Sequence, residues 1–488
     1  MFKSKVFDIL ETFSLDEMKS FKDFVNSPYH NKNKNVVRLF ITLKGYYPNF
    51  ESHQLTKEKT FKTLFPGKKY NDLVMRIMMS NLLSLLEKFL VLQSTGLDRQ
   101  GYSRYLIAEL IKRKLYSSAK KEFSHAGISS ISSPNDFIHK MLLASKKTEF
   151  SILTDNQKGN EEYLQEFGNN LLAYFLIKLP ETYHDLNIHK DLYNINVKHD
   201  FIGYFIENFN FDSYIKYLSD NNFENIELVK LYNNMYRANK NIDDDKSFYD
   251  FKKSIEKQID YLNHEEQYNL YIRLEGLAIE KIERGRSDFY KELFDIYNKM
   301  IKKNILIVPG SVIIPVELFR NIVFTAMVLQ KYRWAEKFIN DYIIFITPNL
   351  KDNVYNHSLA HLYFTTKNFD KALEYLNKVK YKLFVYKADV KILLLQIYLE
   401  TMTLNSAYSA LDSFKKFVTN NKNVSNLFKR RYSGFIKYYG KLLKAIEKND
   451  SKFFSELEYD VKREELILKK QWLLEKLKDA NKLLHFTR

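Results

Sequence analysis

The chain has 488 residues, a formal net charge of +17 and no cysteine, so disulfides, thiol catalysis and cysteine metal sites are all excluded. Apolar residues make up 45% of the chain and aromatic residues 15%, which suffices for a packed interior and excludes a disordered chain. With only 8 prolines and 13 glycines, long helices can run uninterrupted and phosphate-cradling turns are scarce. The length predicts either two to four globular domains or one elongated repeat array.

The beginning of the sequence and its hydropathy predict where the protein resides. Met1 to Leu10 contains Lys3, Lys5 and Asp8 and lacks the apolar stretch of a secretory signal. No run of eighteen apolar residues occurs, since even Val74 to Leu92 is interrupted by charged side chains. We therefore expect a cytoplasmic protein without membrane insertion.

Charge is distributed unevenly along the chain. Residues 1–150 contain 25 basic and 14 acidic residues (+11), residues 151–250 contain 9 and 17 (−8), and residues 351–488 contain 27 and 15 (+12). The basic ends are compatible with contact to nucleic acid or to an acidic protein. They are equally typical of a lysine-rich solvated surface, and the excess of lysine over arginine favours that interpretation.

Residues 1–92 are predicted to form a helical N-terminal domain. Ser14 and Glu17 form a capping-box pattern that starts a helix, and Ser27-Pro28 ends it. Further helices are expected over Lys34–Tyr46, after Thr56 and over Asn71–Leu92.

The Pro66-Gly67 turn lies between two of these helices and is flanked by lysines, as in a DNA-binding helix-turn-helix. The second helix, Asn71–Leu92, is however apolar on most positions, whereas a helix in a DNA groove presents polar side chains. A core helix is therefore favoured over a recognition helix.

A polar stretch with two glycines, residues 93–101, is the expected linker, and residues 102–308 are expected to form an irregular helical-repeat region. Helices are predicted over Asp136–Leu153, Glu161–Lys178, Glu224–Asn239 and Glu265–Arg284. The region contains a polar loop at Asn241–Lys246 and ends at the Val308-Pro309-Gly310 break.

One pattern of small and large apolar residues occurs three times between residues 311 and 420. The small residue of the three copies is an alanine at position 335, 372 or 407, so the copies are spaced by 37 and 35 residues. A period of this size marks stacked helical hairpins. The surrounding offsets of three and four place each apolar set on one helical stripe, and the alanine lets two backbones approach closely.

These residues resemble the tetratricopeptide repeat (TPR). The clearest copy has Leu359, Ala360, Tyr363, Phe369, Ala372, Leu376 and Val379, and a fainter copy occupies 103–128 around Ala119. The chain as a whole also resembles a group of uncharacterised bacterial proteins, through Ser27-Pro28-Tyr29 and Trp472-Leu473-Leu474-Glu475-Lys476, which implies no activity.

Residues 424–488 are predicted to cap the array, because the open end of a repeat array would otherwise expose apolar surface. One helix is expected over Ser451–Leu484, with Trp472 packing against the last hairpin. The fold class expected is therefore all-α, with a helical N-terminal domain followed by an α-α superhelical, TPR-like solenoid and C-terminal capping helices.

The resemblance implies a partner-binding site on the concave face of the array. By that analogy the face is lined by Arg320, Phe324, His357, His361, Phe364, Thr365, Ile392 and Gln396. His357 and His361 are four residues apart and could in principle hold a metal, but the sequence offers no third ligand.

We predict no catalytic residue, no metal and no cofactor. The expected function is a non-catalytic scaffold or adaptor that binds a peptide or partner protein in this groove. The alternative is a nucleic-acid-associated regulatory protein that uses its basic ends, and an enzyme with an unrecognised site between helices is the least favoured. The sequence does not predict the oligomeric state.

Overall fold

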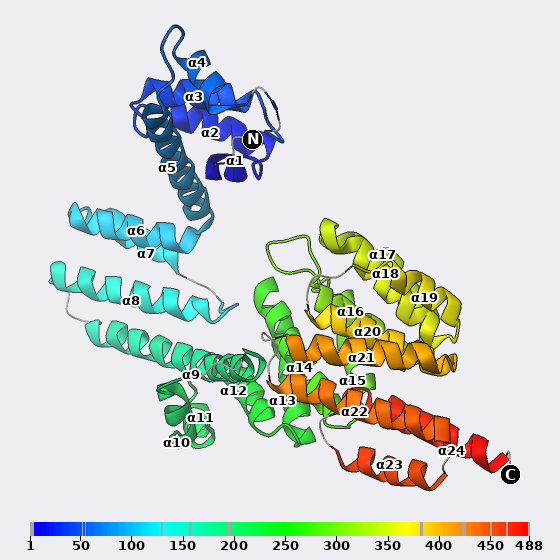
Figure 1. The fold of residues 1–488 in the computed structure, drawn as a ribbon. Helices are drawn as coiled ribbons and strands as arrows, with labels where there is room; N and C mark the ends of the chain where they lie inside the picture. The colour runs from blue at the N-terminus through cyan, green and yellow to red at the C-terminus, as the bar shows by residue number, and fades with distance from the viewer. Residues whose placement is uncertain are drawn as a thin grey trace. The chain divides into compact units, whose positions relative to one another are not determined.

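The computed structural model of the protein describes residues 4–50, 52–53, 55–127, 130–155, 159–193, 197–380, 384–421, 426–448, 451–464 and 467–486. Within these ranges it consists of α-helices and two short 3-10 helices, and no residue is in a strand (Figure 1). The all-α fold expected from the sequence is confirmed. The chain forms two compact units: Met1–Ile128 with His139–Gly168, and Ser129–Ile138 with Asn169–Arg488.

The first unit begins with five helices around one apolar core. These are α1 (Lys5–Leu10), α2 (Leu15–Asn26), α3 (Lys34–Lys44), α4 (Lys57–Leu64) and α5 (Asp72–Leu97), followed by α6 (Arg99–Lys112) and α7 (Tyr116–Ala126). The capping box at the start of α2 is present, with the Ser14 backbone N–H donating to Glu17 and the Glu17 backbone N–H donating to Ser14. The apolar face of α5 lies in the core with Phe21 and Phe40, as expected.

The helix predicted to end at Leu92 continues to Leu97, and α6 begins immediately at Arg99. Gly96 is tolerated near the end of α5, and the Asp98 carboxylate accepts a hydrogen bond from the Gly101 N–H at 2.8 Å, which caps α6. Residues 93–101, where a linker was expected, are therefore the end of α5, a cap and the start of α6.

Helices α8 (Asn135–Leu153) and α9 (Asn160–Tyr193) contain residues of both units. The helix expected to end at Lys178 continues past Pro180. Proline removes a backbone hydrogen bond and usually ends a helix. Here the next turn is held by tertiary contacts, because Glu181 pairs with Arg273 at 2.8 Å.

The second unit continues with the helices shown in green to red in Figure 1. They are α10 (Phe201–Asn208), α11 (Phe211–Asp220), α12 (Ile226–Lys240), α13 (Asp245–Gln258), α14 (His264–Glu283), α15 (Phe289–Lys302), α16 (Val316–Val328), α17 (Tyr332–Tyr342), α18 (Pro348–Thr365), α19 (Phe369–Asn377), α20 (Phe384–Glu400), α21 (Leu404–Asn420), α22 (Asn426–Lys448), α23 (Ser451–Arg463) and α24 (Lys470–Phe486); the 3-10 helices are η1 (Ile259–Tyr261) and η2 (Ile343–Phe345). The single C-terminal helix predicted over Ser451–Leu484 is in fact two helices, α23 and α24.

Four helical hairpins share one bend. Lys114, Gln330, Lys367 and Met402 have positive φ angles of 58°, 56°, 61° and 53°, and each stands two residues before the second helix of its hairpin. The next residue's N–H closes the turn by donating to a carbonyl oxygen five residues back, as Asn368 does to Tyr363 at 2.8 Å. This closure satisfies carbonyls that the end of the first helix leaves unpaired. It joins α6 to α7, α16 to α17, α18 to α19 and α20 to α21.

The alanines of the repeated pattern lie where the two helices of each hairpin meet. Ala119, Ala335, Ala372 and Ala407 are all fully buried. Ala372 packs in one cluster with Ala360 of α18 and with Leu393 of α20, so it contacts both its own hairpin and the next. The arrangement is compatible with a solenoid of stacked hairpins, as the sequence predicts.

Replacing Ala372 by leucine should lower the free energy of unfolding by roughly 1–3 kcal/mol, because the helix crossing has no space for the added carbons. The measurement is the midpoint of urea unfolding. Lys371→Leu, one position away on the exposed side of α19, is the matched control and should leave the midpoint nearly unchanged. An A372L midpoint equal to that of the wild type would show that the crossing is loose.

Candidate partner-binding site on the helical array

The first helices of three successive hairpins form one layer of the array. Helix α16 packs against α18, and α18 packs against α20, while α17 and α19 lie between them in the second layer. Side chains four residues apart on one helix face the same way, so each inner helix presents one stripe. The predicted partner-binding residues all come from this inner layer.

An ion pair connects the two outer helices of the layer. Arg320 Nε on α16 lies 2.9 Å from Asp389 Oδ2 on α20, and both side chains are mostly buried. The contact is an ion pair without the alignment of a hydrogen bond. The Arg320 guanidinium also lies 5.2 Å from the centre of the Phe324 ring on the same helix, which is a cation–π distance.

Two buried histidines of α18 lie close to this pair. His357 is 2% exposed and His361 is 7% exposed, and their rings are 4.7 Å apart. The His361 ring lies 4.3 Å from Phe324. Among the residues that the structure describes, none forms a hydrogen bond with His361 Nε2.

Both imidazoles are held in the neutral form. Burial lowers the pKa of His357 to about 4, with nearby Asp389 acting in the opposite direction and Arg320 and Lys469 adding to the decrease. Burial also lowers the pKa of His361 well below its usual value, helped by His357, Lys469 and Arg320. Desolvation disfavours the charged form of a base, so at neutral pH neither ring adds positive charge to the site.

The structure therefore brings together four of the eight predicted residues: Arg320, Phe324, His357 and His361. The other four lie in different surroundings. Phe364 packs against Phe369 at the hairpin bend, with ring centres 5.9 Å apart. The Thr365 hydroxyl donates to the carbonyl oxygens of its own helix at the end of α18. Ile392 is buried in the cluster shared by α20, α21 and α22, and Gln396 on the same helix is also buried.

Sequence reasoning missed the residue that completes the cluster. Lys469, just before α24, places its ammonium nitrogen 5.6 Å from the centre of the Phe324 ring. The side chain keeps contact with water, yet the protein packed around its ammonium group lowers the pKa, with Asp389 opposing that decrease. No sequence signal marked Lys469, because its role depends on a contact with a helix more than 100 residues earlier.

The C-terminal helices contact one end of the inner layer. The Tyr439 hydroxyl on α22 donates to the Leu395 carbonyl oxygen of α20 at 2.6 Å. On α24, Trp472 Nε1 donates to Glu400 at 3.2 Å, and Lys476 lies 3.0 Å from the same carboxylate. Trp472 is thus a packing residue, as predicted, and the surface around Glu400 is covered by the chain itself.

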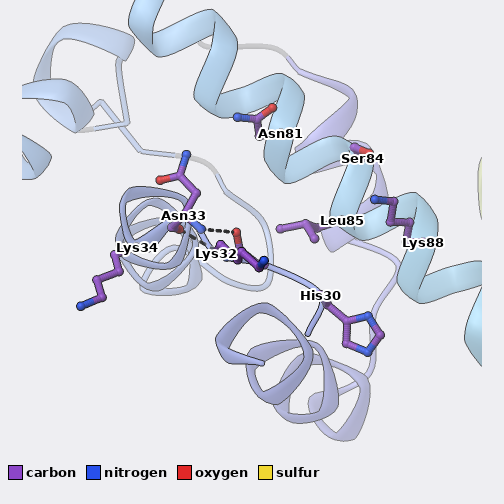
Figure 2. Close-up of a pocket in the computed structure, with 9 residues that line it drawn as sticks. His30, Lys32, Asn33, Lys34, Asn81, Ser84, Leu85 and Lys88 are labelled. Carbon is purple, nitrogen blue, oxygen red and sulfur yellow. Dashed lines mark hydrogen bonds between the residues drawn. The ribbon is translucent and has the colours of Figure 1, made fainter. Parts of the chain in front are cut away.

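A separate pocket of about 570 Å³ lies in the first unit, between the start of α3 and the middle of α5 (Figure 2). Its lining is His30, Asn31, Lys32, Asn33, Lys34, Asn81, Ser84, Leu85 and Lys88. The loop is fixed by Asn31, whose side chain donates to the Val25 carbonyl oxygen at 2.9 Å and accepts from the Asn33 N–H at 2.9 Å. Three lysines give the pocket a positive charge.

Across the described ranges, no three histidine, aspartate or glutamate side chains come together in a way that could hold a metal ion. No helix in these ranges combines the length and the apolar character that crossing a bilayer requires. Comparison of the chain with protein-family models, curated proteins and solved structures gave no match.

Proposed function

We propose that the chain is a non-catalytic scaffold or adaptor that binds a peptide or partner protein on the inner layer formed by α16, α18 and α20. The observation that carries the proposal is the meeting of side chains from separate hairpins at one place. Arg320, Asp389 and the Phe324 ring offer charged and aromatic contacts, and Lys469 supplies a cation that still meets water.

Such a mixture of apolar surface and a few oriented polar groups suits recognition of a peptide. The repeated alanine crossing and its resemblance to the TPR support the same proposal, because arrays of this kind present their inner helices as an extended binding surface. The end of the layer near Glu400 is covered by α24, so the partner binds toward α16 and α18.

Changing Lys469 to glutamate should weaken capture of the partner by about tenfold, because the substitution reverses a charge that a bound peptide meets. The measurement is affinity purification from the native cell, with quantification of the proteins that co-purify with wild type and variant. The exposed Lys371→Glu on α19 is the matched control and should capture the same proteins as the wild type. If K469E also captures them equally, while folding normally, the inner layer is not the binding site.

A second candidate function is supported by the lysine-lined pocket in the first unit. Lys32, Lys34 and Lys88 belong to the lining of a cavity in the segment of the chain that carries a charge of +11, and phosphate groups are attracted to such a surface. Binding to a DNA or RNA duplex that weakens steeply with added salt would favour this function over the scaffold. Failure to bind either duplex at low salt would remove it.

A further inference from the structure

A row of aromatic rings crosses the surface of the second unit over α9, α10 and α11. The ring centres follow one another from Phe175 to Phe205 at 5.3 Å, to Phe209 at 5.1 Å, to Tyr214 at 5.7 Å and to Tyr217 at 6.2 Å. Each step is within the range of a direct aromatic contact. The rings therefore form one continuous row, in which Phe209 and Tyr214 are partly buried against the core of the unit.

Helix α10 turns an apolar stripe outward. Phe201 is 80% exposed, Tyr204 is 74% exposed and Phe205 is also exposed, at positions that repeat as i, i+3 and i+4. The opposite side of the helix holds Ile206, which is buried in the core of the unit. An amphipathic helix normally hides its aromatic residues, so both faces of α10 being apolar requires an explanation.

The same surface extends to neighbouring helices. On α9, Leu171 and Phe175 are exposed one turn apart, and on α11, Tyr217 is 60% exposed. Contiguous apolar surface of more than a few hundred Å² is rare on a monomeric protein and marks an interaction site. We call Leu171, Phe175, Phe201, Tyr204, Phe205 and Tyr217 the aromatic surface.

Acidic residues outnumber lysines in the segment that carries most of the aromatic surface. Residues 197–227 contain six acidic side chains and two lysines. Glu207 on α10 and Asp220 at the end of α11 are exposed, while Asp212, which is 64% exposed, lies 3.9 Å from Arg237. The acidic rim is therefore defined by Glu207 and Asp220. The segment lies within the part of the chain that carries a net charge of −8, while the regions on both sides of it in the sequence are basic or less acidic.

We propose that the aromatic surface binds a basic amphipathic helix of a partner protein. The apolar side of such a helix covers the exposed rings, and its lysines or arginines meet the acidic rim and the faces of the tyrosine rings. A nucleic acid or an anionic membrane carries the same sign of charge as the rim and is repelled by it. The surface is separate from the inner layer of α16, α18 and α20, and the proposal does not depend on the function proposed for that layer.

The probe is a synthetic helical peptide with leucine on one face and lysine on the other, labelled for fluorescence anisotropy. The full-length chain should bind it, and added salt should weaken the binding because exposed charges are screened. The variant Phe201→Ser/Tyr204→Ser/Tyr217→Ser should bind about tenfold more weakly, since the apolar contact is lost. Glu207→Lys/Asp220→Lys should give a loss of similar size through repulsion of the lysines.

Matched controls come from exposed residues elsewhere in the same unit. Tyr261→Ser/Tyr459→Ser removes two exposed tyrosines, and Glu336→Lys/Asp341→Lys reverses two exposed charges, and both should bind as the wild type does. A peptide with glutamate in place of lysine should not bind. Circular dichroism and thermal unfolding establish that each variant is folded.

Three results would overturn the proposal: no binding of the lysine peptide at low salt, equal binding by the surface variants and their controls, or equal binding of the glutamate peptide. A fourth is self-association of the chain that disappears in the serine variant and that the lysine peptide does not compete with. That result would assign the aromatic surface to a second copy of this chain.

Discussion

Lowering the pH from 7.5 toward 5 is expected to destabilise the second unit through His357 and His361, and variants at both positions are expected to lose this contribution to the pH dependence. In the folded protein the pKa of His357 is about 4 and that of His361 is also well below 6.5. An unfolded chain takes up these protons first as the pH falls past 6.5, so acid shifts the equilibrium toward unfolding. The contribution of these two histidines to stability is therefore fully present above pH 6.5 and is lost as the pH falls toward 4.

A fall in the pKa of His357 from 6.5 in the unfolded chain to about 4 in the folded protein corresponds to about 3 kcal/mol of stability. Only the part of this stability that is lost above pH 5 can be measured without interference from titrating carboxylates. The measurement is urea unfolding at several pH values for the wild type and for His357→Gln/His361→Gln. Burial and the nearby Arg273 lower the pKa of His184 on α9 to about 4. The double variant keeps His184, so part of the dependence of stability on pH should remain.

His264 is exposed, so His264→Gln is the matched control and should keep the wild-type slope of stability against pH. The slope of the unfolding free energy against pH is compared between the variants. A lower stability of the double variant at pH 7.5 therefore does not change the expected result. Parallel curves for wild type and double variant would contradict the burial of neutral imidazoles at this place.

Replacing Arg320 by methionine should lower the free energy of unfolding by about 2–4 kcal/mol, because Asp389 is left mostly buried without its cation. Methionine keeps much of the volume of the arginine stem, so the loss reports the missing charge more than a cavity. The measurement is again the midpoint of urea unfolding at neutral pH.

A double variant separates the charge effect from packing. If the ion pair determines the loss, Arg320→Met/Asp389→Asn should recover at least half of the stability that R320M loses, because no buried charge remains unpaired. A double variant whose loss equals the sum of the two single losses would show that the two side chains act independently.

The alanine pattern predicted the hairpins that share it, and it could not predict hairpins that lack it, such as α14–α15. Helices α14 and α15 also form a hairpin closed by a positive-φ residue, Gly285. Their connection has five residues in place of three, and Glu292 stands in α15 where Ala372 stands in α19. The longer turn changes the repeat period although the local turn chemistry is the same, and the Glu292 side chain pairs with Lys252 of α13 instead of lying in the helix crossing.

The candidate site was predictable only in part. Spacing along single helices placed Arg320 and Phe324 on one stripe, and His357 and His361 on another, because that spacing is a local property. The burial of the histidines and the contribution of Lys469 depend on how α20 and the segment before α24 pack against them. Local periodicity does not contain such contacts between distant parts of the chain.

The packing of α22 and α24 against α20 also determines when this unit can finish folding during synthesis. Arg431 of α22 pairs with Glu283 of α14 at 2.9 Å, across 148 residues of sequence. The ribosome synthesises α14 and α20 before α22 and α24. The surfaces of α14 and α20 that these later helices cover therefore stay exposed until synthesis is complete. During that interval the nascent chain is most exposed to aggregation and to chaperones, and a premature stop codon before α22 would leave the chain permanently in that state.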